Sequence, residues 1–203
     1  MGKFIVHEYH PIPIFQNNIG VEKEDLELVK SLEYERMDTN NGSFTKDKYI
    51  LNKMPILKKK IEEQIELFTR NYLKINKSIG FRLLNSWTNI HYPNDFAQSH
   101  THINSVFSGV YYLQTTDNSG DLEFSTPHFN NNITKGLLFQ YDEYTHVNAN
   151  YYRVKPYDGE IVIFPSHLAH GVCKNESDQE RYSLAFNVFP TGVLGDKETE
   201  LKL

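Results

Sequence analysis

Three histidines occur at positions that would allow them to bind one metal ion. His100 and His102 are separated by a single residue and lead into the β-rich run 106–114. In extended backbone, residues i and i+2 point to the same face, so both imidazoles can aim at one point. His170 follows a second β-rich run, 160–165, at the predicted exit of that strand. Because neutral imidazoles with open positions beside them suit metal-assisted chemistry, we predict that these three histidines are the metal ligands and the catalytic residues.

Each of these histidines also has a structural interpretation. His170 follows an apolar strand and would serve equally well as a hydrogen-bonded structural histidine. In the alternative for His100 and His102, one of them binds the metal, and the other contacts a metal ligand without touching the metal itself. His91, at the end of the run 81–91, is expected to be exposed to solvent or to line the mouth of the site.

A guanidinium and a hydroxyl form a second chemical pair further along the chain. Arg181 begins the predicted strand 181–189, and Ser183 lies two residues later on the same face. Together they form a fork that suits a carboxylate, whereas the alternative for Arg181 is a surface ion pair of little energetic value. Asn89 and Tyr112 also lie on predicted strands and are expected to border the same pocket, although a core position is the simpler interpretation of the tyrosine.

The first part of the chain is predicted to supply supporting elements. Residues 3–15 contain β-branched residues and two prolines, which is typical of an edge strand or an extended arm. Residues 21–34 have the pattern of a short amphipathic helix, and residues 36–48 are rich in loop-forming residues. The clearest helix spans 57–72, just after Pro55, and should cover a sheet. Its apolar stripe consists of Leu57, Ile61, Ile65, Phe68 and Tyr72.

From residue 81 onward, short strands alternate with polar turns. The predicted strands are 81–91, 106–114, 121–125, 137–140, 151–155, 160–165 and 181–189. Many short strands at this spacing indicate a sandwich or a barrel. Residues 126–150 are expected to form a long loop near its mouth, and residues 192–203 a charged tail that frays.

Composition excludes several classes of protein. The chain has 203 residues and a formal net charge of −5, with its basic residues scattered, so no duplex nucleic-acid partner is expected. No apolar run reaches the roughly 18 residues that a membrane span needs. The single cysteine excludes an internal disulfide and favours a reducing cytoplasm. The oligomeric state stays open, with a homodimer among the possibilities.

Five segments, in order along the chain, carry a resemblance to a known family. They are Trp87–Asn89, His100–His102, Ser108–Leu113, Phe164–Pro165 with His170, and Arg181–Ser183 with Phe186–Asn187. This pattern resembles a small family of 2-oxoglutarate/Fe(II)-dependent oxygenases found in bacteria and their viruses, and it covers roughly residues 85–190. The resemblance implies a mainly β fold with flanking α-helices, namely a double-stranded β-helix, the cupin-like jelly roll.

The resemblance also implies a division of labour along the chain. A single oxygenase domain would span residues 1–203, with an N-terminal arm and supporting helices in 1–80, the jelly-roll core in 81–190 and a tail in 191–203. His100, His102 and His170 would bind Fe(II). Arg181 and Ser183, bordered by Asn89 and Tyr112, would bind the cosubstrate 2-oxoglutarate. The enzyme would use O2 to hydroxylate a C–H bond of an unidentified peptide side chain or small molecule, releasing succinate and CO2.

One departure from the usual pattern keeps other functions open. Related oxygenases have His-x-Asp or His-x-Glu where this chain has His100 and His102, so three neutral ligands would leave the ion's charge unreduced. Asp95, Asp121 and Glu123 are the nearest carboxylates in sequence that could complete the usual set. The alternatives are a three-histidine, cupin-type dioxygenase that does not use 2-oxoglutarate, and a non-catalytic jelly-roll module with a binding or structural role.

Overall fold

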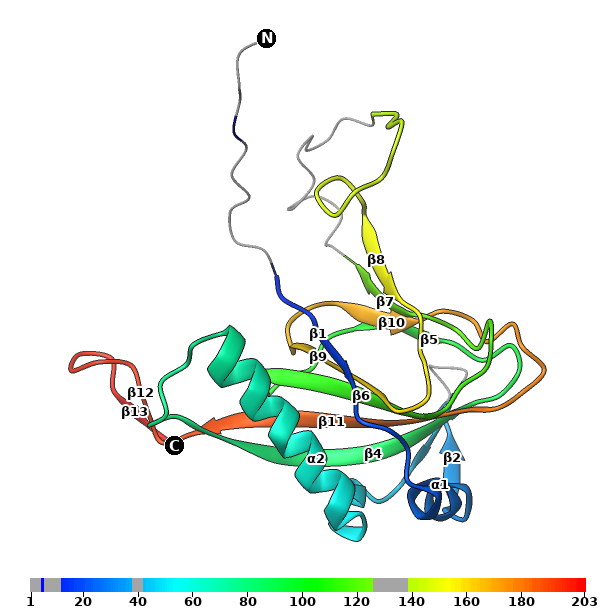
Figure 1. Ribbon diagram of the computed structural model, residues 1–203, viewed down its shortest axis with the longest axis horizontal. Helices are drawn as coiled ribbons and strands as arrows, with labels where there is room; N and C mark the ends of the chain where they lie inside the picture. Colours follow the sequence, from blue (N-terminus) through cyan, green and yellow to red (C-terminus); the bar gives the residue numbers. More distant parts are fainter. Residues whose placement is uncertain (1–4, 6–11, 38–41, 126–138) are drawn as a thin grey trace.

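The computed structural model describes residue 5 and residues 12–37, 42–125 and 139–203, and its main feature is a pair of antiparallel β-sheets (Figure 1). The larger sheet contains β1 (Phe15–Asn18), β2 (Tyr34–Arg36), β3 (Ser43–Thr45), β4 (Gly80–His91), β6 (Phe107–Gln114), β9 (Glu160–Pro165) and β11 (Arg181–Thr191). The smaller sheet contains β5 (Ala97–His100), β7 (Leu122–Ser125), β8 (Tyr151–Val154) and β10 (His170–Val172). Their spatial orders are β1-β9-β6-β11-β4-β3-β2 and β5-β10-β7-β8.

The eight strands from β4 to β11 form a double-stranded β-helix. The chain passes repeatedly from one sheet to the other, so that β4, β6, β9 and β11 lie in the larger sheet and β5, β7, β8 and β10 in the smaller. The ladder between β4 and β11 runs from the pair His91 and Arg181 to the pair Gly80 and Thr191. The predicted jelly-roll fold is confirmed, and most of its long strands follow the alternation read from the sequence.

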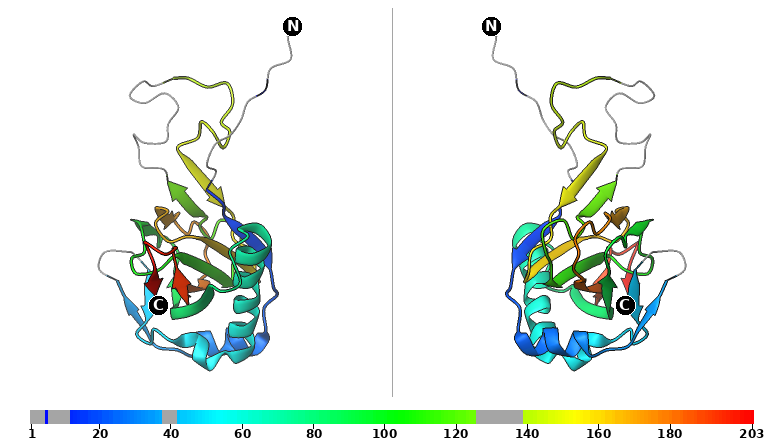
Figure 2. Two further views of the ribbon diagram at one scale, coloured as in Figure 1. Left: turned by 90° about the vertical axis from the view of Figure 1, so that its left-hand side faces the viewer. Right: turned by 90° about the vertical axis from the view of Figure 1, so that its right-hand side faces the viewer.

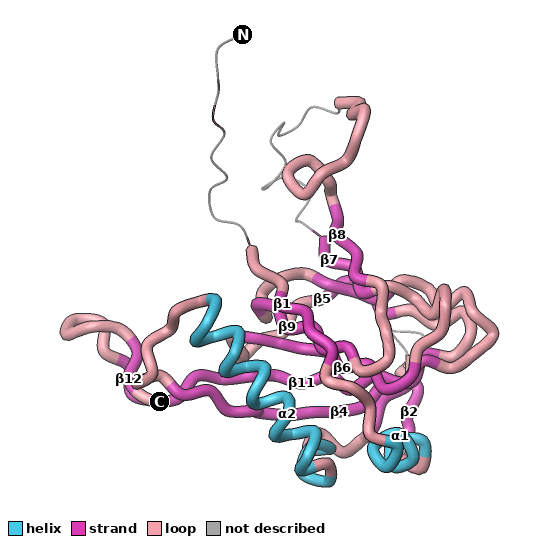
Figure 3. The backbone as a smooth tube through the Cα atoms, viewed as in Figure 1, coloured by secondary structure: helices cyan, strands magenta, loops and turns pink. Residues whose placement is uncertain are grey.

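In the described part of the chain, the helices lie on the outer face of the larger sheet (Figure 3). They are α1 (Lys23–Lys30), the 3₁₀ turn η1 (Ile50–Lys53), α2 (Pro55–Glu66) and the π-helical segment η2 (Leu67–Tyr72). Pro55 occupies the first turn of α2, where its missing N–H costs nothing. Among the described residues, no helix has the length and apolar content that a membrane span requires.

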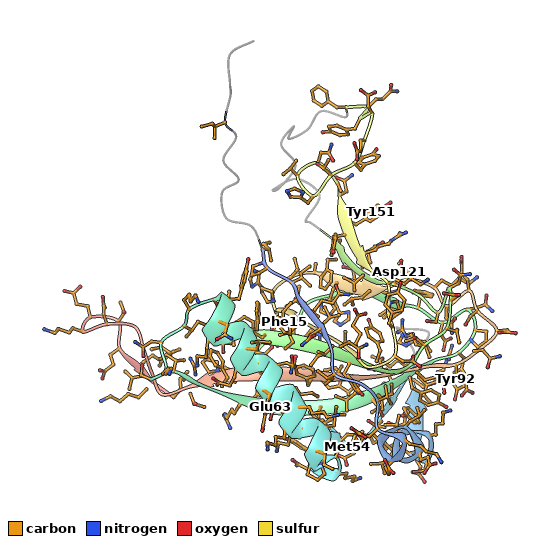
Figure 4. The ribbon with its side chains drawn as sticks, viewed as in Figure 1. Phe15, Met54, Glu63, Tyr92, Asp121 and Tyr151 are labelled. Atoms are coloured by element: carbon orange, nitrogen blue, oxygen red, sulfur yellow. The ribbon has the colours of Figure 1, made fainter. Side chains whose placement is uncertain are left out.

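The predicted helical stripe is confirmed except at its last residue. Leu57, Ile61, Ile65 and Phe68 are buried, but 64% of the Tyr72 surface is exposed. The π-helical segment explains the difference, because a wider turn, closed by Leu73 N–H on Phe68 O, rotates Tyr72 away from the sheet. The Tyr72 ring still stacks on Phe68, which in turn packs against Phe15 of β1. Phe15 is labelled in Figure 4.

The strands of the larger sheet separate an apolar outer face from a polar inner face. On β11, Leu184, Phe186 and Val188 pack into the core beneath the helices. The residues between them, together with Arg181 and Ser183, face the other sheet and line an internal cavity. A smaller apolar cluster, including Phe124 of β7 and Phe164 of β9, joins the two sheets. The inner face is therefore available for chemistry, while the outer face provides stability.

Several short strands differ from the sequence predictions. The edge strand β1 begins at Phe15 and pairs with β9, whereas a strand or arm was predicted over 3–15; residues 1–4 and 6–11 lie outside the described part. β3 interrupts the predicted loop 36–48, and β2 ends at its first residue, Arg36. β2 pairs with β3 and β3 pairs with β4, so these three-residue strands depend on partners that their own sequence pattern does not reveal.

The long loop and the tail also differ. In the predicted strand 137–140, residues 137 and 138 lie outside the described part, and Phe139 and Gln140 are not in a strand. Residues 126–138 of the predicted long loop also lie outside the described part. Residues 139–150 extend beyond the β7–β8 ladder, on the side where Figure 4 labels Tyr151 (Figure 2). None of residues 139–150 lines the cavity. The fraying predicted for 192–203 is wrong, because β12 (Val193–Leu194) pairs with β13 (Leu201–Lys202).

Gly109 on β6 lets the ring of Phe186 pack directly against the backbone of its neighbouring strand. A Cβ placed there would overlap the ring of Phe186 on the neighbouring strand. We expect Gly109→Ala to lower the free energy of unfolding by about 1–3 kcal/mol, measured by urea denaturation. Adding Phe186→Leu should recover part of that loss relative to the sum of the two single changes. Additive effects would show that this overlap does not govern stability.

Candidate metal centre

The two sheets bring the three predicted histidines to one point. His100 ends β5 and lies directly opposite His170, the first residue of β10. His102 follows β5, and its backbone N–H donates to Ser166 O over 2.9 Å. One ring nitrogen from each histidine lies within 4.8 Å of the others. His170 is buried, His102 is half-buried and His100 is exposed, so the cluster is open on one side.

His170 does not end the strand 160–165, as the sequence suggested. β9 stops at Pro165, a turn closed by Leu168 N–H on Pro165 O follows, and His170 begins a separate strand in the other sheet. The three-residue strand β10 is too short to be recognised from its own pattern. It exists because β5 and β7 pair with it on both sides.

Backbone carbonyls orient two of the imidazoles. The Nδ1–H of His100 donates to Gln98 O over 2.8 Å, and the Nδ1–H of His170 donates to Leu168 O over 2.9 Å. These bonds fix the tautomer in which Nε2 carries a free lone pair. This is the arrangement in which a histidine binds a metal through Nε2 while its other nitrogen is held by the protein.

The distance between ring nitrogens fits a shared ion. The Nε2 atoms of His102 and His170 are 3.2 Å apart. Two nitrogens about 2.1 Å from one ion would lie about 3.0 Å apart at a right angle and about 3.4 Å apart at the tetrahedral angle. Burial lowers the pKa of His102 to about 4 and that of His170 to about 3, with the adjacent imidazoles adding to both shifts. Both side chains are therefore neutral, and able to bind a cation, at neutral pH.

No carboxylate completes this cluster among the residues that the structure describes. Asp95 accepts two hydrogen bonds from Arg36, at 2.6 and 2.7 Å, and Glu123 accepts from Arg153 at 2.8 Å. Asp121 precedes β7 (Figure 4), and neither it nor the other two acids lines the cavity. The three-histidine set is thus what the described residues offer to a metal.

Beside the histidines, the inner face of the larger sheet lines a cavity of about 780 Å³. Three strands contribute residues in register, so that the lining forms rows across β4, β11 and β6. The rows are Asn89, Ser183 and Tyr112; Trp87, Ala185 and Val110; and Asn85, Asn187 and Ser108. The Trp87 ring lies 5.9 Å from that of His102, which places the middle row beside the histidines.

Arg181 lies at one end of these rows and is buried, with 1% of its surface exposed. Its Nη1 donates to Gly120 O over 2.7 Å, and its Nη2 donates to His91 Nδ1 over 2.9 Å. The guanidinium carbon is 5.8 Å from the centre of the Tyr112 ring. Its Nε–H is buried without a hydrogen-bond partner. The surface ion pair considered from the sequence is therefore wrong, and a buried cation with an unused donor faces the cavity.

Ser183, Asn89 and Tyr112, the other residues expected to border a cosubstrate, occupy one row. Ser183 pairs with Asn89 on one side and with Tyr112 on the other. All three line the cavity, next to the row of Arg181 and His91. Tyr112 also packs in the apolar cluster between the sheets, so both interpretations of this residue describe it.

Sequence reasoning missed the role of His91. It was expected at the surface or the mouth, but 6% of its surface is exposed and its Nδ1 accepts a hydrogen bond from Arg181. Burial lowers the pKa of His91 well below its usual value, and the charge of Arg181 lowers it further. The signal was the alternation of β4, because His91 continues the inward face of Trp87 and Asn89 by two more residues.

A second missed feature is a chain of hydrogen bonds at the opposite end of the cavity. Ser108 Oγ donates to Asn187 Oδ1 over 2.7 Å, and Asn187 Nδ2 donates to Asn85 Oδ1 over 2.9 Å. The Ser166 and Ser108 hydroxyls lie 2.9 Å apart. These polar groups bond to one another, and this explains why polar residues recur on strands that otherwise build a core.

Acid is expected to destabilise the metal-free protein. His91, His102 and His170 have folded-state pKa values below the unfolded value of about 6.5. Below that pH the unfolded chain binds protons that the folded chain does not, so stability falls as pH drops from about 6.5 toward 4. The urea midpoint should decrease between about pH 7.5 and 5.5. In His91→Asn, whose Oδ1 can accept from Arg181 without titrating, the decrease should be smaller; equal decreases would contradict this role for His91.

The chain matches the sequence profile of a known family over the segment that contains the site. The profile of the 2OG-Fe(II) oxygenase family matches residues 85–187, which is about half of the chain and runs from within β4 to within β11. All three histidines, Arg181 and Ser183 lie inside the matched segment. No curated protein sequence matches the chain significantly.

Solved structures resemble this fold over most of its length. A Pseudomonas putida prolyl-4-hydroxylase is 14% identical, with a TM-score of 0.53, over 87% of this chain and 92% of that one. The epimerase SnoN of nogalamycin biosynthesis is 12% identical, with a TM-score of 0.59, over 89% and 79%. HygX from Streptomyces hygroscopicus, solved with nickel and 2-oxoglutarate bound, is 10% identical, with a TM-score of 0.55, over 89% and 84%. At these identities the likeness shows the fold alone.

Proposed function

Because the chain belongs to the 2OG-Fe(II) oxygenase family, we propose that it hydroxylates a C–H bond of a second substrate at a metal bound by His100, His102 and His170. When bound, Fe(II) and 2-oxoglutarate supply the oxidising chemistry: one oxygen atom of O2 enters the hydroxyl product and the other enters succinate, with release of CO2. The observation that carries this proposal is the convergence of three imidazoles, two of them oriented by backbone carbonyls, with a buried arginine in one cavity.

The protein's own residues position the cosubstrate. The two terminal nitrogens of Arg181 donate to Gly120 O and to His91, and its unpartnered Nε–H is left for an anion. A carboxylate there would receive charge-assisted hydrogen bonds in a site shielded from water, where such bonds are strong. Ser183, Asn89 and Tyr112 would border the chain of the same molecule between Arg181 and the histidines.

The absence of a carboxylate from the histidine cluster of the described residues favours a second candidate, a three-histidine dioxygenase that does not use 2-oxoglutarate. Arg181 argues against it, because a buried guanidinium with a free donor is costly unless an anion binds there. Solved structures with this fold include an epimerase as well as a hydroxylase. The fold does not determine the reaction, so hydroxylation is part of what we propose.

An anaerobic titration with Fe(II) and then 2-oxoglutarate tests the function. The expected result is a weak visible absorption band that appears only with both present, followed by succinate release on admitting O2. Iron binding without such a band would favour the three-histidine dioxygenase. No metal binding at all would leave a non-catalytic jelly-roll module.

The remaining sequence-based assignments belong to the same proposal. We place one oxygenase domain across residues 1–203, in the cytoplasm, acting on a peptide side chain or a small molecule. Neither a membrane nor duplex nucleic acid is part of this function. Equilibrium sedimentation would distinguish a monomer from a homodimer.

A further inference from the structure

The charge of the cavity differs from that of the protein as a whole. The chain carries a formal net charge of −5, yet the described residues that line the cavity include two cationic side chains, Arg181 and Lys48, and no aspartate or glutamate. A divalent ion held by three neutral histidines would add its full charge. The two carboxylates of 2-oxoglutarate offset that ion, which leaves the cavity positive. A second ligand that binds in this positive cavity is therefore expected to carry a negatively charged group.

Lys48 lines the cavity and is held there through both its backbone and its side chain. Its carbonyl accepts from Ser86 N–H of β4 over 2.7 Å, which fixes its backbone to the sheet. Its Nζ donates to Thr45 O over 3.1 Å and lies 3.9 Å from the centre of the Phe44 ring and 5.6 Å from that of Trp87. The ammonium is thus positioned by one carbonyl and two rings, and two of its three N–H groups remain for a ligand.

No carboxylate among the described residues forms an ion pair with Lys48. The acid nearest to it along β2, Glu35, pairs with Lys46 at 2.7 Å instead. Lysines that do form ion pairs in the described part, such as Lys23, Lys53 and Lys155, are exposed at the surface. Lys48 differs from them because it is half-buried, lines the cavity and contacts aromatic faces.

We propose that the primary substrate carries a carboxylate or phosphate group, that Lys48 binds this group, and that Trp87 and Phe44 pack against the part of the substrate next to it. This inference rests on the proposed function, since it assumes that 2-oxoglutarate occupies Arg181. The position of Trp87 beside both Lys48 and His102 then places the body of such a substrate over the metal. Ile103, which is exposed next to His102, adds an apolar surface at the same rim.

The test uses the protein loaded with Zn(II) and saturating 2-oxoglutarate, so that the metal and Arg181 are occupied and no turnover occurs. Three probes are titrated: phenylacetate, phenyl phosphate and the neutral phenylacetamide. Trp87 reports binding, because it is the chain's single tryptophan and lines the cavity. At least one acidic probe should bind about tenfold more tightly than the amide, and which of the two does so identifies carboxylate or phosphate as the anion.

Lys48→Gln should remove most of that preference without changing the affinity for the amide. Lys59→Gln, which removes the same charge from the exposed face of α2, should leave it intact. Equal affinities for acids and amide in the wild type, no measurable binding of either acid, or a preference that survives Lys48→Gln would overturn the proposal. The Fe(II) and 2-oxoglutarate band, recorded on the same variants, separates the two failures: if the band forms and the preference is absent, only this inference fails.

Discussion

Replacing His170 by alanine should abolish the Fe(II) and 2-oxoglutarate band and all succinate release. His170 is the most buried of the three histidines, and its Nδ1–H bond to Leu168 O aims Nε2 at the cluster. Changing a group that merely supports a ligand typically costs 10–100-fold in metal affinity. Removal of a ligand itself should therefore weaken Fe(II) binding by more than about 100-fold.

The chain offers a matched control three residues earlier. His167 is exposed and lines no part of the cavity. His167→Ala should therefore bind Fe(II) as the wild type does, with an unchanged band. Retention of the band in His170→Ala, with the fold intact by circular dichroism, would mean that the metal binds elsewhere and that the cluster is structural.

Arg181→Lys should raise the KM for 2-oxoglutarate by about 100-fold while leaving Fe(II) binding in the absence of cosubstrate unchanged. Lysine keeps the charge but lacks the planar fork that can hold Gly120 O, His91 and a carboxylate at once. Each hydrogen bond to a charged group contributes about 1.5–3 kcal/mol, so the loss of one or two accounts for a change of this size.

The same substitution should lower the stability of the protein. The carbonyl of Gly120 would lose a buried partner, at a cost of about 1–3 kcal/mol. Arg82→Lys, at an exposed position on β4, is the control and should change neither KM nor stability. A KM close to that of the wild type in Arg181→Lys would show that the cosubstrate does not use this residue, and would favour the three-histidine dioxygenase.

The sequence predicted the long strands of the jelly roll but not the short ones. β4, β6, β9 and β11 each have enough residues to show an alternating or continuously apolar pattern. β5 and β10 have four and three residues, and they become strands only through pairing with segments far away in the chain. These two short strands carry His100 and His170, so the site depends on the elements that sequence patterns reveal least.

The candidate site was predictable where residue spacing alone carried the information. The His100 and His102 pair needs only two residues of extended chain to share a direction. The depth of Arg181 could not be predicted, because the carbonyl that holds it belongs to a turn at Gly120, about 60 residues away. For His91, the alternation of β4 gave its inward direction, but its hydrogen bond with Arg181, at a sequence separation of 90 residues, could not be predicted.

The passage of the chain between two sheets also determines when the site can form during synthesis. His100 pairs with His170, and β4 pairs with β11, the last strand of the jelly roll in chain order. Closing such large loops costs chain entropy before any contact repays it, so folding should be slow and should finish at the C-terminal end. A nascent chain that stops after β9 contains only two of the three imidazoles. Acquisition of metal would then be a late event, and it would report that the whole barrel has closed.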